Sequence, residues 1–225
     1  QEGHCYLPES VLRERLTKLL QLEPENLKEL LAELQMEKRV VLRRTGEESE
    51  NCKVYLANYD RMELHVAAML GELDLREARP GIRAAEELAL LEEEAAGPVL
   101  DETQRRAVLA AVQSGLLIIT GGPGTGKTTT INAIIRCFEA EGAEILLAAP
   151  TGRAAARMTE ATGREAKTIH RLLEVSGAPS EQNEGENGKE NWSSVRFDRN
   201  KEQPLEADCI IIDEMSMVDL RLFHA

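Results

Sequence analysis

Residues 116–130 read LLIITGGPGTGKTTT, and this stretch decides the fold class. Its apolar start, residues 116–120, predicts a buried strand, and residues 121–128 match the phosphate-binding pattern G-x-x-x-x-G-K-T. Glycines allow backbone N–H groups to surround phosphate oxygens, and the N-terminus of a following helix adds partial positive charge. A flexible glycine-rich turn is the simpler alternative, but the strand and helix predicted on its flanks favour a nucleotide site.

The loop residues have separable expected roles. Lys127 is expected to reach the β and γ phosphates as a point charge, and Thr128 is expected to offer its hydroxyl to Mg²⁺. The predicted ATP-binding set in this loop is Gly122, Pro123, Gly124, Thr125, Gly126, Lys127, Thr128 and Thr129.

A second motif, Asp213-Glu214, follows an apolar run and supplies two carboxylates. A metal ion that bridges two phosphates needs a carboxylate at the carboxyl end of a neighbouring strand, where nucleotides bind in open parallel sheets. Asp213 is predicted to hold Mg²⁺ through its water shell. Glu214 is the candidate general base that orients the attacking water, so Lys127 and Glu214 form the predicted catalytic pair.

Gln104 precedes the predicted nucleotide strand, at the start of a helix that Asp101 is placed to cap. A glutamine amide at the rim of a nucleotide site can accept from N6 of adenine and donate to N7. Gln104 is therefore a candidate for adenine binding. The simpler alternative is an exposed residue at a helix start.

The segment APTGRAAARM, residues 149–158, begins where a second strand is predicted to end. Backbone and side-chain groups there could hold a phosphate of single-stranded DNA. An ordinary strand-to-helix turn is the alternative, and a histidine such as His170 is more often structural than catalytic. The predicted DNA-binding residues are Pro150, Thr151, Gly152, Arg153, Thr168 and His170.

Strand and helix alternate around these motifs, which predicts an α/β fold with a parallel sheet covered by helices. Earlier in the chain, leucines at helical spacing in residues 11–34 predict two short helices. Two β-branched patches, 40–42 and 54–56, then predict a hairpin with a polar turn across residues 43–53. Helices followed by a two-stranded ribbon are typical of a winged-helix module.

Composition limits the function classes. Of 225 residues, 42% are hydrophobic and 30% charged, and 27 Lys and Arg against 40 Asp and Glu give a net charge of −13. Without a long apolar run, membrane insertion is not expected. The acidity argues against a protein that coats nucleic acid electrostatically, but not against a locally basic groove. Four widely spaced cysteines predict reduced thiols and a cytoplasmic location, without a zinc or redox motif.

Taken together, the strings in residues 100–107, 121–130, 149–158, 168–173 and 213–219 closely resemble the RecD-like branch of superfamily 1 DNA helicases, the exodeoxyribonuclease V alpha subunit family. The resemblance implies a motor of two RecA-like lobes that moves 5′ to 3′ on single-stranded DNA, uses ATP and Mg²⁺, and serves DNA repair or recombination with protein partners. The expected domains are a winged-helix-like α+β domain (1–60), a helical linker (61–96) and an incomplete RecA-like lobe (97–225) with a mobile insertion (177–203).

The 225 residues are expected to be the amino-terminal piece of a longer motor, because motif III, the second lobe and its arginine finger have no counterpart in them. That arginine is typically worth about 10³–10⁵ in rate, so the piece is expected to bind ATP–Mg, to hydrolyse it poorly and not to unwind DNA. Two alternatives stay open. One is the helicase half of a conjugative relaxase, and the other is a non-enzymatic adaptor built on the winged-helix module.

Overall fold

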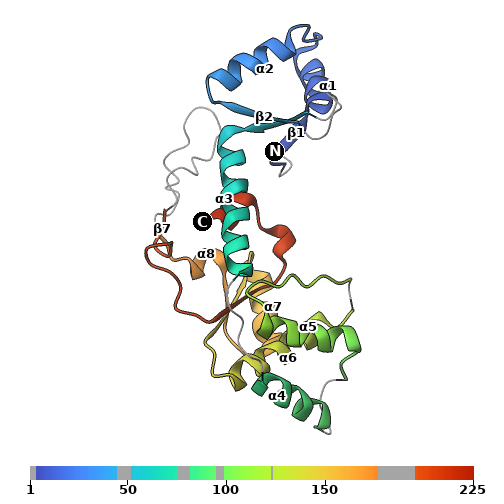
Figure 1. Cartoon of the computed structure of the whole chain (residues 1–225), viewed down its shortest axis with the longest axis vertical. Helices are drawn as coiled ribbons and strands as arrows, with labels where there is room; N and C mark the ends of the chain where they lie inside the picture. Colours follow the sequence, from blue (N-terminus) through green and yellow to red (C-terminus); the bar gives the residue numbers. More distant parts are fainter. Residues whose placement is uncertain (1–3, 45–51, 76–81, 95–98, 123, 177–195) are drawn as a thin grey trace. The chain divides into compact units, whose positions relative to one another are not determined.

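The computed structural model of the chain describes residues 4–44, 52–75, 82–94, 99–122, 124–176 and 196–225. These residues form two compact units (Figure 1). The first unit comprises Gln1–Gly71 and Asp219–His224, and the second comprises Glu72–Val218 together with Ala225.

The first unit is a small α+β assembly. It contains β1 (Tyr6–Pro8), α1 (Glu9–Leu20), α2 (Leu27–Met36), β2 (Val40–Arg44), β3 (Cys52–Leu56) and α3 (Ala57–Asp74), which continues to the boundary, and it is completed by α9 (Leu220–His224). The strands form an antiparallel sheet in the order β1-β3-β2. Apolar side chains from α2 and the sheet are buried together: Leu27, Leu31, Val40 and Val54. The half-buried Leu12 and Leu16 of α1 pack against them.

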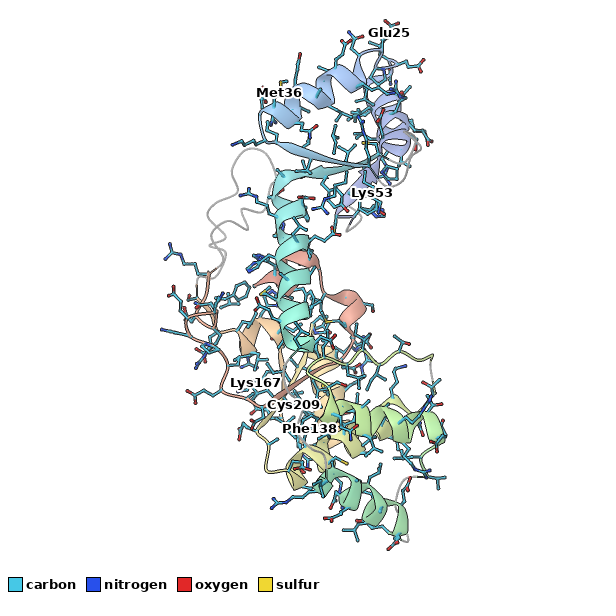
Figure 2. The ribbon with its side chains drawn as sticks, viewed as in Figure 1. Glu25, Met36, Lys53, Phe138, Lys167 and Cys209 are labelled. Atoms are coloured by element: carbon cyan, nitrogen blue, oxygen red, sulfur yellow. The ribbon has the colours of Figure 1, made fainter. Side chains whose placement is uncertain are left out.

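The two predicted helices and the predicted strand pair are therefore confirmed, whereas β1 was not expected. The predicted polar turn lies mostly outside the described residues. The winged-helix interpretation stays a prediction, because a helix pair on a three-stranded sheet does not by itself define that fold. In Figure 2, Met36 lies at the end of α2, and its side chain is exposed.

Two aromatic contacts attach α9 to α3 within the first unit. His65 Nδ1 and His224 Nε2 lie 2.9 Å apart, and the Arg221 guanidinium lies 5.2 Å from the Tyr59 ring centroid. Burial, with a smaller contribution from the charge of His65, lowers the pKa of His224 below its ordinary value. The docked arrangement thus favours a neutral His224.

The second unit is a mixed α/β lobe of the P-loop NTPase type. It contains α4 (Ile82–Glu93), α5 (Glu102–Gln113), α6 (Lys127–Ala140), β4 (Ile145–Ala149), α7 (Gly152–Thr162), β5 (Ala166–Thr168), α8 (Ile169–Leu172) and β8 (Cys209–Ile212), followed by η2 (Met215–Met217). The parallel sheet has the order β5-β4-β8, with Leu147 opposite both Ala166 and Ile211. This register brings the carboxyl ends of the three strands to one edge.

The core of this lobe lies where α4, α5 and α6 meet. Its buried residues are Ala84, Leu88, Leu91, Leu100, Val108, Val112, Ala133, Ile134, Cys137 and Phe138, and Cys209 packs against them from β8. Figure 2 shows Phe138 and Cys209 near each other in this region. Burial raises the pKa of the Cys137 thiol to about 11, and the thiol donates to the carbonyl oxygen of Ala84 at 3.4 Å.

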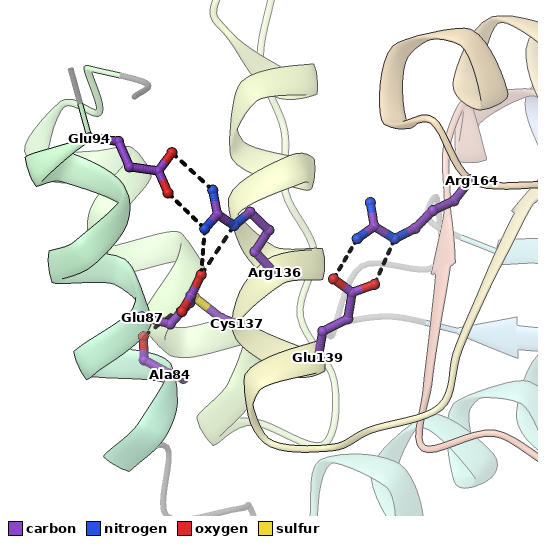
Figure 3. A network of polar contacts seen from close by, with 7 residues as sticks. All are labelled: Ala84, Glu87, Glu94, Arg136, Cys137, Glu139 and Arg164. Carbon is purple, nitrogen blue, oxygen red and sulfur yellow. Dashed lines mark hydrogen bonds and ion pairs between the residues drawn. The ribbon is translucent and has the colours of Figure 1, made fainter. Parts of the chain in front are cut away.

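Helix α4 therefore belongs to the lobe, although its sequence was assigned to a linker ending at residue 96. Figure 3 shows the polar contacts that reinforce its packing. Arg136 of α6 pairs with Glu87 at 2.8 Å and with Glu94 at 2.9 Å. The division falls between Gly71 and Glu72 instead of near residue 96, because the apolar side of α4 is covered by α5 and α6.

The predicted strand at residues 116–120 is wrong, since this segment forms no strand in the structure. Leu117, Ile118 and Ile119 are 39%, 77% and 39% exposed. Strand propensity reflects how side chains pack on a pleated surface, but a ladder also needs a backbone partner, and this segment has none among the described residues. The helix predicted to begin near Gln104, the helix predicted after the phosphate loop and the strand predicted to end where the segment 149–158 begins are confirmed as α5, α6 and β4.

The predicted mobile insertion at 177–203 is only partly described, because residues 177–195 lie outside the described set. Its final part contains secondary structure that was not expected, while its mobility stays a prediction. β7 (Arg196–Phe197) pairs antiparallel with β6 (Val175–Ser176), and the next turn is closed by hydrogen bonds between the backbones of Asn200 and Gln203. Polar composition alone did not reveal this hairpin pairing. Among the described residues, no helix has the length and apolarity needed to cross a membrane.

Candidate functional site

The glycine-rich loop leads directly into α6, as the sequence predicts. Gly126 is the N-cap of α6 with φ 75°, and Gly124 has φ 76°, both in the left-handed region that glycine adopts without strain. The Thr125 hydroxyl donates to the carbonyl oxygen of Gly122 at 2.9 Å. The loop thus leads into the N-terminus of α6, where the first N–H groups of a helix lack intrahelical partners. Pro123, also predicted to bind ATP, lies outside the described residues.

Lys127 is turned back onto this loop. Its Nζ donates to the carbonyl oxygens of Gly121 at 2.7 Å and Gly122 at 2.8 Å. These two carbonyls satisfy part of the hydrogen-bonding capacity of the ammonium group, which therefore lies against the loop.

Gln104 lies against the same loop. Asp101 caps α5 and forms a reciprocal capping box with Gln104. In addition, the Gln104 Nε2 donates to the carbonyl oxygen of Thr125 at 3.1 Å. The predicted proximity to the nucleotide site is therefore present, but the contact with the loop backbone was not foreseen from the sequence.

The two carboxylates of the second motif lie at the end of β8. The Asp213 N–H donates to the carbonyl oxygen of Ala148 at 3.0 Å, which continues the pairing of β8 with β4. Its Oδ1 accepts from the Glu214 N–H at 2.8 Å, and Glu214 has φ 56°, an uncommon conformation outside glycine. Backbone pairing thus holds Asp213, while the turn directs the chain away from the sheet.

Thr128, Asp213 and Glu214 line one open cavity of about 510 Å³. This cavity joins the helix after the phosphate loop to the end of β8. The metal and base roles of these residues stay predictions. Hydroxyl and carboxylate oxygens are the ligands that a hard divalent cation prefers. The described residues contain no cluster of three or more His, Cys, Asp or Glu that could hold a metal ion alone. Such a site fits an ion that takes its remaining ligands from phosphate and water.

Arg157 of α7 lines the same cavity. From the sequence alone, this arginine is predicted only as part of the segment 149–158, which could contact DNA. Its position follows from the packing of α7 beside β4, since Met158 is buried under the sheet and Arg157 is its exposed neighbour. Sequence spacing alone could not reveal that packing.

The predicted DNA-binding residues lie after the carboxyl ends of β4 and β5, which are adjacent strands. The hydroxyl oxygens of Thr151 and Thr168 accept from the N–H groups of Ala154 and Arg171, each at 3.2 Å. Both threonines therefore act as helix caps in the structure. Arg153 is exposed, and the His170 ring centroid lies 6.3 Å from that of Phe197. The fold brings these predicted residues to one edge, but their contact with DNA stays a prediction.

Comparisons with known proteins agree with this geometry. A family model described as "AAA domain" matches residues 104–225. The chain is 31% identical over 229 residues to the "ATP-dependent RecD2 DNA helicase" of Deinococcus radiodurans, covering 97% of this chain and 28% of the relative. It is 38% identical over 145 residues to the "RecBCD enzyme subunit RecD" of Mycobacterium tuberculosis, covering 54% and 22% respectively.

A third relative comes from a virus. The "ATP-dependent DNA helicase dda" of Enterobacteria phage T4 is 39% identical over 108 residues, which cover 47% of this chain and 22% of that protein. The chain thus spans about a quarter of the length of these curated relatives.

Proposed function

The chain belongs to the AAA-domain family, within it to the RecD-like superfamily 1 helicases, and from this premise we propose that it binds ATP and Mg²⁺ as part of a DNA helicase motor. Membership implies ATP binding with a divalent metal ion. We propose that this ion is Mg²⁺, and we also propose the role of each residue named below.

One observation carries the proposal. The helix that follows the phosphate loop and the two carboxylates after β8 meet at one cavity, with Thr128 on one side and Asp213 and Glu214 on the other. Phosphoryl transfer needs little covalent chemistry from the protein, so positioning and charge stabilisation account for most of the catalysis. A loop for phosphates facing oxygen ligands for a cation is the arrangement this chemistry needs.

The proposed mechanism assigns one task to each group. Lys127 releases the carbonyls of Gly121 and Gly122 and pairs with the β and γ phosphate oxygens. Thr128 and Asp213 hold the divalent ion, which when bound neutralises phosphate charge. Glu214 orients the attacking water and accepts its proton. The exposure of Glu214 at the cavity leaves room for that water.

For the polymer substrate we propose single-stranded DNA, with movement from 5′ to 3′ and a role in repair or recombination. The support is the edge after β4 and β5, where α7 begins with Gly152 and Arg153 both exposed. A helix N-terminus with an adjacent arginine suits a backbone phosphate. The relaxase-type motor uses the same chemistry and remains the second candidate.

We further propose that the 225-residue polypeptide, studied alone, binds ATP–Mg but hydrolyses it slowly and does not unwind duplex DNA. The family resemblance places the arginine finger in a second lobe, and the described residues of this polypeptide form only one such lobe. A turnover comparable to that of a complete helicase in the presence of single-stranded DNA would contradict this part of the proposal.

The test of the nucleotide site uses a fluorescent ATP analogue with and without Mg²⁺. We expect Asp213→Asn to remove most of the Mg²⁺ dependence of binding. Asp198→Asn is the matched control, because Asp198 accepts from the Ser176 hydroxyl in the hairpin, outside the cavity. Equal metal dependence in wild type and Asp213→Asn would refute the proposed role of Asp213.

A further inference from the structure

The side-chain amide of Gln104 is engaged at both ends. Its Oε1 accepts from the Asp101 N–H at 2.9 Å, and its Nε2 donates to the carbonyl oxygen of Thr125 at 3.1 Å. One bond fixes the amide to the start of α5, and the other fixes it to the phosphate loop. The residue therefore connects two segments of the lobe that are separated by the exposed residues 117–120.

The contact is also sterically tight. A Cβ atom added at Gly126 would clash with the Gln104 Nε2, so the end of this side chain would have to move away from the loop. Glycine at this position thus suits both the positive φ and the present approach of the amide. The amide contacts the Thr125–Gly126 peptide, whose second residue is the N-cap of α6.

We propose that Gln104 is a positioning residue for the phosphate loop, which sets the orientation of the Thr125–Gly126 peptide and with it the N–H groups that receive phosphate. The inference rests on the proposed nucleotide binding at this loop. It goes beyond adenine recognition, because the effect reaches the phosphates of any ligand, with or without a base. A glutamine amide has two N–H groups and two acceptor lone pairs, so its two hydrogen bonds within the lobe leave one N–H group and one lone pair for a base.

The two roles predict different ligand dependence. If Gln104 only reads adenine, its loss weakens binding of ATP and leaves binding of an inorganic polyphosphate unchanged. If it positions the loop, its loss weakens both ligands by a similar factor. The loss of one neutral hydrogen bond corresponds to a change of about five- to tenfold in affinity.

The experiment measures Mg-ATP and Mg-tripolyphosphate binding by calorimetry on the whole 225-residue chain. We expect Gln104→Ala to weaken both ligands about five- to tenfold. Gln104→Glu should weaken both at least as much, because it keeps an acceptor for the Asp101 N–H but places a carboxylate oxygen against the carbonyl of Thr125. Asp101→Ala is the control: it removes the side-chain cap of α5 and retains the amide contact with the loop, so both affinities should stay within about twofold.

The outcomes separate the two proposals. Binding of both ligands by wild type, with Gln104→Ala weakening ATP alone, overturns the positioning role and leaves the proposed function standing. A wild type that binds neither ligand overturns the proposed function, and the inference with it. Hydrogen exchange on the ligand-free chain adds a second readout. We expect Gln104→Ala, but not Asp101→Ala, to speed exchange in the peptide covering residues 121–128, and equal exchange in both variants would overturn the inference.

Discussion

Replacement of Leu88 by alanine tests whether α4 is part of the motor core. Leu88 is 4% exposed and packs with buried side chains of α5 and α6. Truncating a buried leucine removes its transfer free energy and leaves a cavity, which together cost about 3 kcal/mol. Because domains are typically stable by about 5–15 kcal/mol, this is a large fraction of the free energy of unfolding of the lobe. If α4 were only a linker, Leu88→Ala would not lower the free energy of unfolding of the lobe by this amount.

Leu90→Ala is the matched control, since it makes the same change on the same helix at a position that is 57% exposed. We expect it to change the free energy of unfolding by less than about 0.5 kcal/mol. Hydrogen exchange across a urea series, read on peptides from α6, would report the lobe separately from the first unit. A loss below about 1 kcal/mol for Leu88→Ala, or equal losses for the two variants, would refute the assignment of α4 to the core.

Three further predictions concern the carboxylate motif, the α3–α9 contact and the DNA edge. Glu214→Gln should lower whatever ATP hydrolysis is measured by at least about 10²-fold while binding persists; an equal loss of both would argue against a general base. Because the pKa of His224 is lowered in the folded state, docking of α9 should be favoured above a pH of about 6.5 and weaken as pH falls through the lowered pKa. Protection of the α9 amides, calculated after correction for the pH dependence of intrinsic exchange, should therefore fall from pH 7 to 5, and His224→Gln should flatten that dependence; pH-independent protection in the wild type would contradict this. Arg153→Ala should weaken the binding of single-stranded DNA and reduce the slope of its salt dependence by the contribution of about one phosphate contact, while the affinity for ATP stays unchanged. A loss of ATP affinity instead would contradict the placement of Arg153 at the DNA edge.

Local chemistry made much of the lobe predictable from the sequence. The capping residue Asp101, the glycine loop and the apolar periodicity of α6 are properties of a few neighbouring residues, and the structure confirms the elements they predict. The same applies to Asp213 and Glu214, because an apolar run that ends in carboxylates carries its own strand-end signal. These features placed Thr128 and the carboxylates at one site before their geometry was known.

Pairing and packing between distant segments could not be read in this way. The run at residues 116–120 has strand propensity but no ladder partner, and its side chains are exposed. Helix α4 has an amphipathic pattern that fits a linker as well as a core helix, and only its contacts with α5 and α6 decide between them. The bond from Gln104 to the loop likewise depends on how α5 meets α6, which residue spacing does not specify.

The central claim is that the loop ending at Lys127 binds the phosphates of ATP together with a divalent metal ion. Calorimetric titration of Mg-ATP into the 225-residue chain tests it most directly, with Lys127→Ala compared with Lys201→Ala, an exposed position outside the cavity. The account predicts one site per chain that needs the metal, a loss of at least about tenfold in affinity for Lys127→Ala, and no change for Lys201→Ala. Absence of binding, or binding that is indifferent to both Lys127 and the metal, would contradict it.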